Sequence, residues 1–75
     1  FNPSTTISFD LPRSSPVKLQ VFDLQGRLVK ELVNGELLAG RHSIVFDGAA
    51  LPSGMYVYRL TTPEFTDLHK MLLLK

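Results

Sequence analysis

The fold is decided by Thr5-Thr6-Ile7-Ser8-Phe9-Asp10-Leu11. Apolar side chains at positions 7, 9 and 11 alternate with polar ones at 6, 8 and 10, which is the two-residue period of a β-strand with one buried face. Pro12 ends the strand, because proline has no N–H to donate to a neighbouring strand. The stretch therefore predicts a half-buried strand near the start of the chain.

Three later segments also have the character of strands. Residues 17–22 alternate in the same way, and residues 41–47 place Ile44 and Phe46 on one face. Residues 55–61 are rich in aromatic and β-branched side chains, which favour strands. All three segments lie between clusters of turn-forming residues, as short strands usually do.

The remaining two segments are harder to place. In residues 28–33 the apolar side chains follow a helical spacing, but the segment is too short for a stable helix, so a short edge strand is preferred to a helix. Residues 34–40 are expected to form a loop whose leucines fold back against one end of the core. Residues 65–74 are predicted to form a long last strand. Because its end is apolar on both faces, this strand is expected at the centre of a sheet.

These segments define an all-β architecture. No helical connection is long enough to join parallel neighbours, so the strands must pair mostly antiparallel. We therefore predict a small antiparallel immunoglobulin-like β-sandwich of about six to seven strands. Its 75 residues suit one domain, residues 1–75, and because the chain starts at Phe1 rather than Met, we expect it to be a piece of a longer polypeptide.

Turn residues mark the ends of the predicted strands. Asn2-Pro3 opens the chain as a turn, and Asp23 to Gly26 fit a type I turn with Asp first and Gly fourth. Asp47-Gly48 forms another turn. Gly54 is expected to take a backbone conformation that a side chain would hinder.

Composition excludes several classes of function. Eight basic and seven acidic residues give a net charge of +1 without a basic stripe, which argues against nucleic-acid binding. No apolar run is long enough for insertion into a membrane. The chain has no cysteine, and His42 and His69 lie on separate strands without a close ligand pair. We therefore expect no catalytic, cofactor-binding or metal-binding residue.

A set of landmarks is shared with a known family. They are Asn2-Pro3, Val17 to Asp23 followed by Gly26, Gly40 to His42, Phe46-Asp47-Gly48, Leu51 to Leu60 with Gly54 and Tyr56, and the lysine-bounded tail Lys70 to Lys75. In this order they resemble the type A C-terminal sorting domain of the type IX secretion system. Phe46 stands where such domains often carry tryptophan. The sequence also resembles, as a related family, the immunoglobulin-like domain of flagellar hook-capping proteins.

The resemblance implies a sorting signal rather than an enzyme. An upstream cargo would reach the periplasm, and an outer-membrane translocon would recognise this domain. A sortase-like peptidase would then remove it, leaving the cargo secreted or attached to the cell surface. The cleaved bond would lie before the domain, and no cofactor is implied.

The last strand is the best candidate for the recognised feature. The candidate residues are Lys70, Met71, Leu72, Leu73, Leu74 and Lys75. The alternative is a passive spacer or a carbohydrate-binding module in which Tyr56 or Tyr58 stacks on sugar rings. Weak self-association through an open edge strand is also compatible with a sandwich of this kind.

Overall fold

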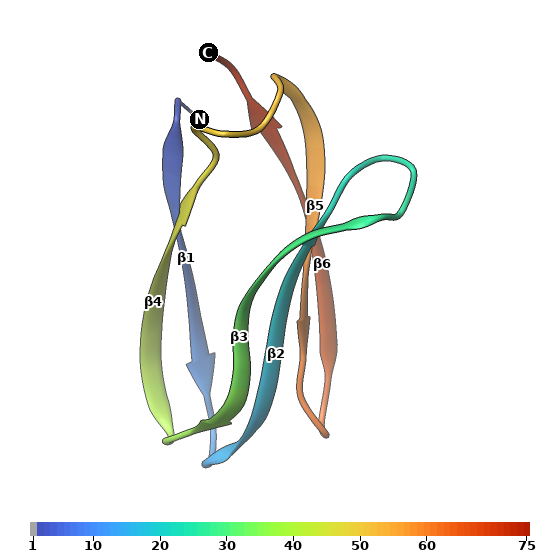
Figure 1. Ribbon diagram of the computed structural model, residues 1–75. Helices are drawn as coiled ribbons and strands as arrows, with labels where there is room; N and C mark the ends of the chain where they lie inside the picture. The colour runs from blue at the N-terminus through green and yellow to red at the C-terminus, as the bar shows by residue number, and fades with distance from the viewer. Residues whose placement is uncertain (1) are drawn as a thin grey trace.

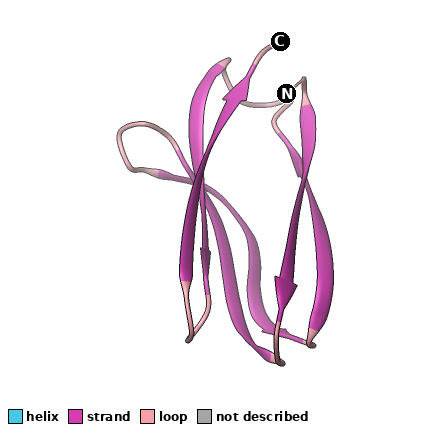
Figure 2. Cartoon of the chain, turned by 180° about the vertical axis from the view of Figure 1, so that it is seen from behind, coloured by secondary structure: helices cyan, strands magenta, loops and turns pink. Residues whose placement is uncertain are grey.

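The computed structural model describes residues 2–75 and consists of strands joined by short connections (Figures 1 and 2). Within these residues no helix is present. The strands are β1 (Ser4–Leu11), β2 (Ser15–Phe22), β3 (Leu28–Leu37), β4 (Gly40–Asp47), β5 (Gly54–Thr61) and β6 (Thr66–Leu73).

The strands form two antiparallel sheets that pack face to face (Figure 1). One sheet pairs β1 with β4, and the other has the order β3-β2-β5-β6. The start of β1 and the end of β6 lie at the same end of the molecule. The predicted all-β antiparallel sandwich is confirmed, and the six strands of residues 2–75 fall within the predicted six to seven.

The core lies between the sheets and follows the predicted alternation. Residues 7, 9 and 11 of β1 and residues 17, 19 and 21 of β2 are all buried. Phe46 from β4 is completely buried among them, together with Tyr56, Leu60 and Leu73. Each fully buried aliphatic side chain contributes about 1.5–3 kcal/mol, so the sandwich is stabilised by packing.

Strand β3 is longer and less regular than predicted. The expected loop over residues 34–40 is wrong, because β3 continues to Leu37. Its pairing with β2 shifts register twice, so Leu32 and Val29 are extra residues without a counterpart on β2. Each such bulge moves the side-chain alternation by one position. This shift produces the spacing that resembles a helix.

Strand β6 lies at the edge of the four-stranded sheet, so its predicted central position is wrong. Its two apolar faces have different surroundings. Leu73 is completely buried, whereas Leu68 and Leu72 are exposed on the opposite face. The leucines on the outer face are therefore surface residues, and they do not indicate a second packed layer.

The turns follow the sequence predictions. Gly26 N donates to Asp23 O at 3.0 Å, which closes the predicted turn, and Gly26 has a φ of 83°. Asp47 Oδ1 accepts a hydrogen bond from Ala49 N at 2.9 Å. Gly54 has a φ of 151°, a region that side chains disfavour, as predicted.

The structure also shows the conformation of two other turn residues from the sequence analysis, Pro3 near the start of the chain and Gly40 at the start of β4. The Asn2–Pro3 peptide bond is cis, and Pro3 O accepts a hydrogen bond from Gly48 N at 2.8 Å. Gly40 begins β4 opposite Leu11.

Candidate recognition surface

The predicted recognition residues on β6 point to two different sides. Leu68 and Leu72 are 63% and 45% exposed, and Lys70 between them is also exposed. Met71 is partly buried against the core, and Leu73 is 0% exposed. Because neighbouring side chains of a strand alternate between faces, Lys70 and Leu72 can contact a partner while Met71 and Leu73 hold the strand in place.

Strand β5 extends the exposed side of β6 into a surface. Met55 is in register with Leu72, Val57 with Lys70, and Arg59 with Leu68. Residues directly opposite on antiparallel strands share a face of the sheet. The face continues onto β2, where Phe22 is in register with Val57.

Arg59 is held over this face. Its guanidinium carbon lies 4.8 Å from the centroid of the Phe22 ring, and Nη2 donates to Gln20 Oε1 at 2.9 Å. Phe22, Val57, Arg59 and Leu68 border a shallow cavity of about 330 Å³, together with the exposed Leu24. We call the set Phe22, Leu24, Met55, Val57, Leu68 and Leu72 the outer apolar face.

The end of the chain is attached to the connection between β4 and β5. Lys75 N donates to Ser53 Oγ at 3.2 Å, and Lys75 Nζ donates to Ala49 O at 2.6 Å. Leu74, just before it, is exposed. Lys75 therefore has a positioning role within the domain, which the sequence pattern did not indicate.

Leu73 packs beneath the same connection. A Cβ built on Gly48 would lie 3.0 Å from Leu73 Cδ2 and 3.2 Å from Pro3 O. Gly48 thus sits where the start of the chain, the β4–β5 connection and β6 meet. Only glycine fits this junction without displacing a neighbour.

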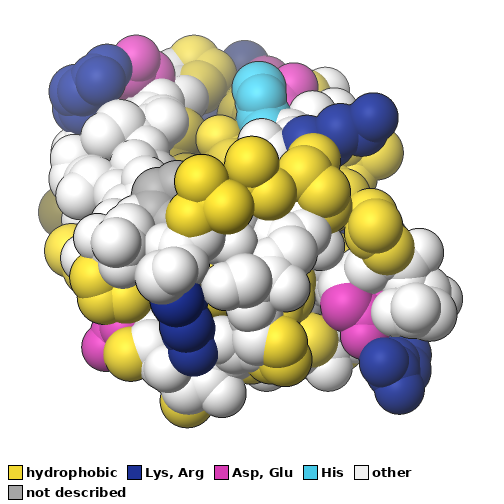
Figure 3. Space-filling view, turned by 90° about the horizontal axis from the view of Figure 1, so that it is seen from above, with side chains coloured by type: hydrophobic (Ala, Val, Ile, Leu, Met, Phe, Trp, Pro, Cys, Tyr) yellow, Lys and Arg dark blue, Asp and Glu magenta, His cyan; other side chains and the backbone are white. Residues whose placement is uncertain are grey.

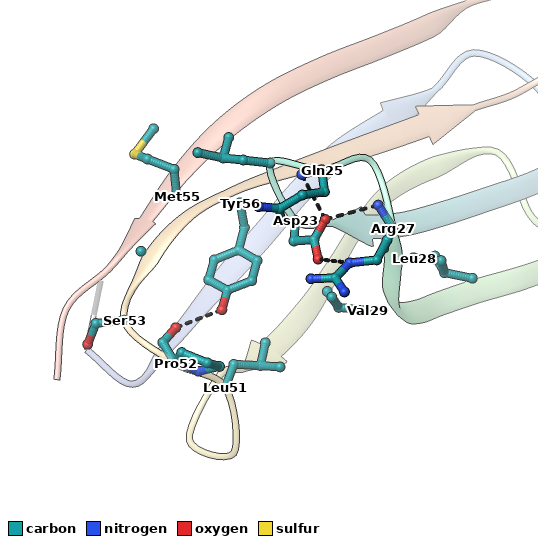
Figure 4. A pocket seen from close by; sticks show the side chains of 12 residues that line it. Asp23, Gln25, Arg27, Leu28, Val29, Leu51, Pro52, Ser53, Met55 and Tyr56 are labelled. Carbon is teal, nitrogen blue, oxygen red and sulfur yellow. Dashed lines mark hydrogen bonds and ion pairs between the residues drawn. The ribbon is translucent and has the colours of Figure 1, made fainter.

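Tyr56 is a structural residue. Its side chain is inside the domain at 5% exposure, and its hydroxyl donates to Pro52 O at 2.6 Å. It borders a cavity of about 510 Å³ between the β2–β3 turn and the β4–β5 connection (Figure 4). A buried ring with its hydroxyl already bonded cannot offer a flat platform to a sugar.

Asp23 borders the same cavity (Figure 4). Its carboxylate accepts hydrogen bonds from the backbone N–H groups of Arg27 and Gln25, at 3.0 and 2.9 Å, and from Arg27 Nε at 2.8 Å. The pKa of Asp23 is lowered, first by the Arg27 backbone N–H and then by its side chain. Asp23 is therefore engaged in its own turn.

The remaining aromatic and histidine residues form two stacked pairs. Tyr58 stacks on His69 with 5.0 Å between ring centroids, and Phe9 stacks on His42 at 5.6 Å. Burial, followed by the charge of Asp67, raises the pKa of Tyr58. The two histidines belong to different sheets, and within residues 2–75 no three His, Cys, Asp or Glu side chains are grouped for metal binding.

The sequence pattern missed most of the outer apolar face. The sequence predicts strands at Met55, Val57 and Leu68 but does not indicate that these three side chains share an outward face. The available signal was their alternate spacing on the β5–β6 hairpin, opposite to the buried Tyr56 and Leu60. The pairing of β2 with β5, which adds Phe22, required the three-dimensional structure.

Comparisons with known proteins identify the family. Among residues 2–75, no helix is long and apolar enough to cross a membrane. The chain matches the family described as secretion system C-terminal sorting domain over residues 2–74. Searches of curated proteins and of solved structures found no match. Because the family match extends over nearly the whole sequence, the chain belongs to the C-terminal sorting domains of type IX secretion.

Proposed function

We propose that this domain directs an upstream cargo protein through the type IX apparatus to the cell surface or the medium. The observation that carries the proposal is the family match over residues 2–74. It is supported by a sandwich with its own core and an exposed C-terminal strand. Residues 1–75 then act as one module of a longer exported protein.

In this proposal the domain is a passive signal. An outer-membrane translocon binds it after passage through the periplasm, and a sortase-like peptidase separates it from the cargo. The cleaved bond lies upstream of the domain, so its own side chains perform no catalytic step. Compact folding serves this role because the recognised side chains stay in fixed positions.

The candidate recognition residues take different parts. Lys70, Leu72 and Leu74 are exposed and are assigned to contact with the apparatus. Met71 and Leu73 hold β6 on the core, and Lys75 fastens the strand end to Ala49 and Ser53. With this division, one short segment both stabilises the domain and presents the side chains that the secretion apparatus recognises.

A reporter fusion tests the proposed function. A reporter with a signal peptide and residues 1–75 at its C-terminus is expressed in cells with a type IX apparatus and in matched cells without it. Export is expected only in the first strain. If the reporter folds but stays in the periplasm of both strains, the sorting function is wrong.

Two variants separate recognition from folding in this assay. Lys70→Ala is expected to reduce export while leaving the circular dichroism and melting temperature unchanged. Leu73→Ala is expected to reduce both export and stability, because removing a fully buried leucine costs about 2–5 kcal/mol. Equal export of wild type and Lys70→Ala would remove Lys70 from the recognised set.

A further inference from the structure

The outer apolar face is one continuous surface. Met55, Val57 and Leu72 are neighbours across β5 and β6, and Phe22 and Leu68 border the same cavity on either side of Val57. Isolated exposed leucines are ordinary on a protein surface, whereas adjacent ones on a rigid sheet indicate an interaction site. Seen from the end that carries both termini, hydrophobic side chains reach the surface beside Lys and Arg (Figure 3).

Lys18, Arg59 and Lys70 lie on the outer side of the four-stranded sheet, and Glu31 on β3, which accepts hydrogen bonds from Gln20 and Asn34, lies on the same side. Arg59 and Lys70 lie between the apolar residues, and the outward positions of β5 and β6 in register with them carry no carboxylate. Asp67 is in register with buried Leu60 on the other side of the sheet. Asp23, which borders the cavity, is already bonded to Arg27. The face therefore combines apolar contacts with two cations, Arg59 and Lys70, that form no salt bridge within residues 2–75.

Arg59 also has donor capacity left over. Nη2 is bonded to Gln20, but the buried Nε has no hydrogen-bond acceptor within residues 2–75. A buried donor without an acceptor is unfavourable. Because Nε is buried, a partner's carboxylate would approach the guanidinium from the solvent side, and this charge-assisted contact would strengthen binding of the partner.

We infer that the outer apolar face binds a protein component of the type IX machinery whose own contact surface is apolar and carries carboxylates. The inference rests on the proposed sorting function and adds the chemistry of the partner. It also enlarges the recognised surface from the tail of β6 to residues of β2 and β5. Phe22 and Val57 supply apolar contact, and Arg59 and Lys70 supply charge pairing.

The same features argue against two other occupants. A second copy packed face to face would bring the cations of each copy toward those of the other, which is unfavourable. An anionic membrane is usually held by clusters of about four to eight cations, whereas β2, β5 and β6 present three on this side of the sheet, Lys18, Arg59 and Lys70. A carboxylate-bearing protein surface matches the face in both polarity and charge.

Photocrosslinking from single positions tests the inference. A photoreactive residue replaces Leu68 on the face, or Val45 on the outside of the opposite sheet, which is equally exposed at 64%. Each fusion is incubated with purified type IX translocon in detergent, and crosslinked peptides are sequenced. Crosslinks from position 68 to translocon segments containing Asp or Glu, with few from position 45, are expected. Crosslinks from position 68 to a second copy or to lipid, or equal yields from both positions, would overturn the inference.

Charge reversal gives an independent measurement. Lys70→Glu is expected to weaken translocon binding about tenfold, the change that corresponds to about 1.4 kcal/mol. Lys30→Glu on β3 alters the net charge equally and should leave binding within about twofold, because exposed charges more than about 10 Å apart are largely screened in salt.

The two variants also separate the inference from the proposed function. If wild type is exported and bound but Lys70→Glu binds as tightly, the inference fails and the sorting function stands. If wild type itself is neither exported nor bound, both fail.

Discussion

Replacing Gly48 by alanine probes the junction that joins both ends of the domain. The added Cβ would lie 3.0 and 3.3 Å from the two Leu73 methyl carbons and 3.2 Å from Pro3 O. Leu73 is fully buried and Pro3 O accepts a hydrogen bond from Gly48 N, so moving either neighbour disturbs the packed junction. Overfilling a packed site costs about 1–3 kcal/mol. A loss of about 2 kcal/mol in the free energy of unfolding lowers the Tm of a domain of this size by about 8–16 °C.

The assay is thermal and urea unfolding followed by circular dichroism, with Gly35→Ala as the matched control. A Cβ on Gly35 meets nothing within 4 Å, and its φ is not in the left-handed region. That control should match wild type or gain up to about 1 kcal/mol. Trimming the neighbour with Leu73→Val should reduce the cost of Gly48→Ala, since the two sites are in contact. Gly48→Ala melting together with wild type would refute the description of this junction.

Two further predictions concern polar groups. Tyr56→Phe removes the hydrogen bond to Pro52 O and should cost about 1–2 kcal/mol in urea unfolding; an unchanged midpoint would mean that water replaces this bond. The lowered pKa of Asp23 stabilises the fold above its unfolded value near 3.8 and loses this contribution as pH falls through the folded value. Unfolding midpoints of wild type should therefore fall more steeply than those of Asp23→Asn between about pH 5 and about pH 2; parallel curves would contradict this assignment.

The sequence predicts the fold well where each strand has one solvent-exposed face and one buried face. The alternation in β1 and β2 identified the buried residues directly, because a period of two determines which side chains share a face. Strand β3 was only partly predicted. Its bulges at Leu32 and Val29 depend on how β3 aligns with β2, and local residue spacing does not contain that information.

The tail of β6 stays a prediction as the recognised feature, and the structure adds where its side chains lie. The sequence pattern indicates this tail, yet it predicts the apolar residues of the tail at the centre of a sheet, whereas β6 lies at an edge. A leucine on an outward position is indistinguishable in sequence from one facing a second layer. The attachment of Lys75 to Ala49 and Ser53 joins segments more than 20 residues apart, and it follows from how the β4–β5 connection folds.

The interrupted pairing of β3 also affects how copies of this domain meet one another. A neighbouring chain can add to an open sheet most readily when it finds a long flat row of backbone groups. The longest uninterrupted pairing of this strand with β2 runs from Ser15↔Leu37 to Leu19↔Val33. Beyond it, the extra residues Leu32 and Val29 bend and twist this edge of the sheet. Molecules crowded together would therefore find little straight backbone on β3 on which to assemble into aggregates.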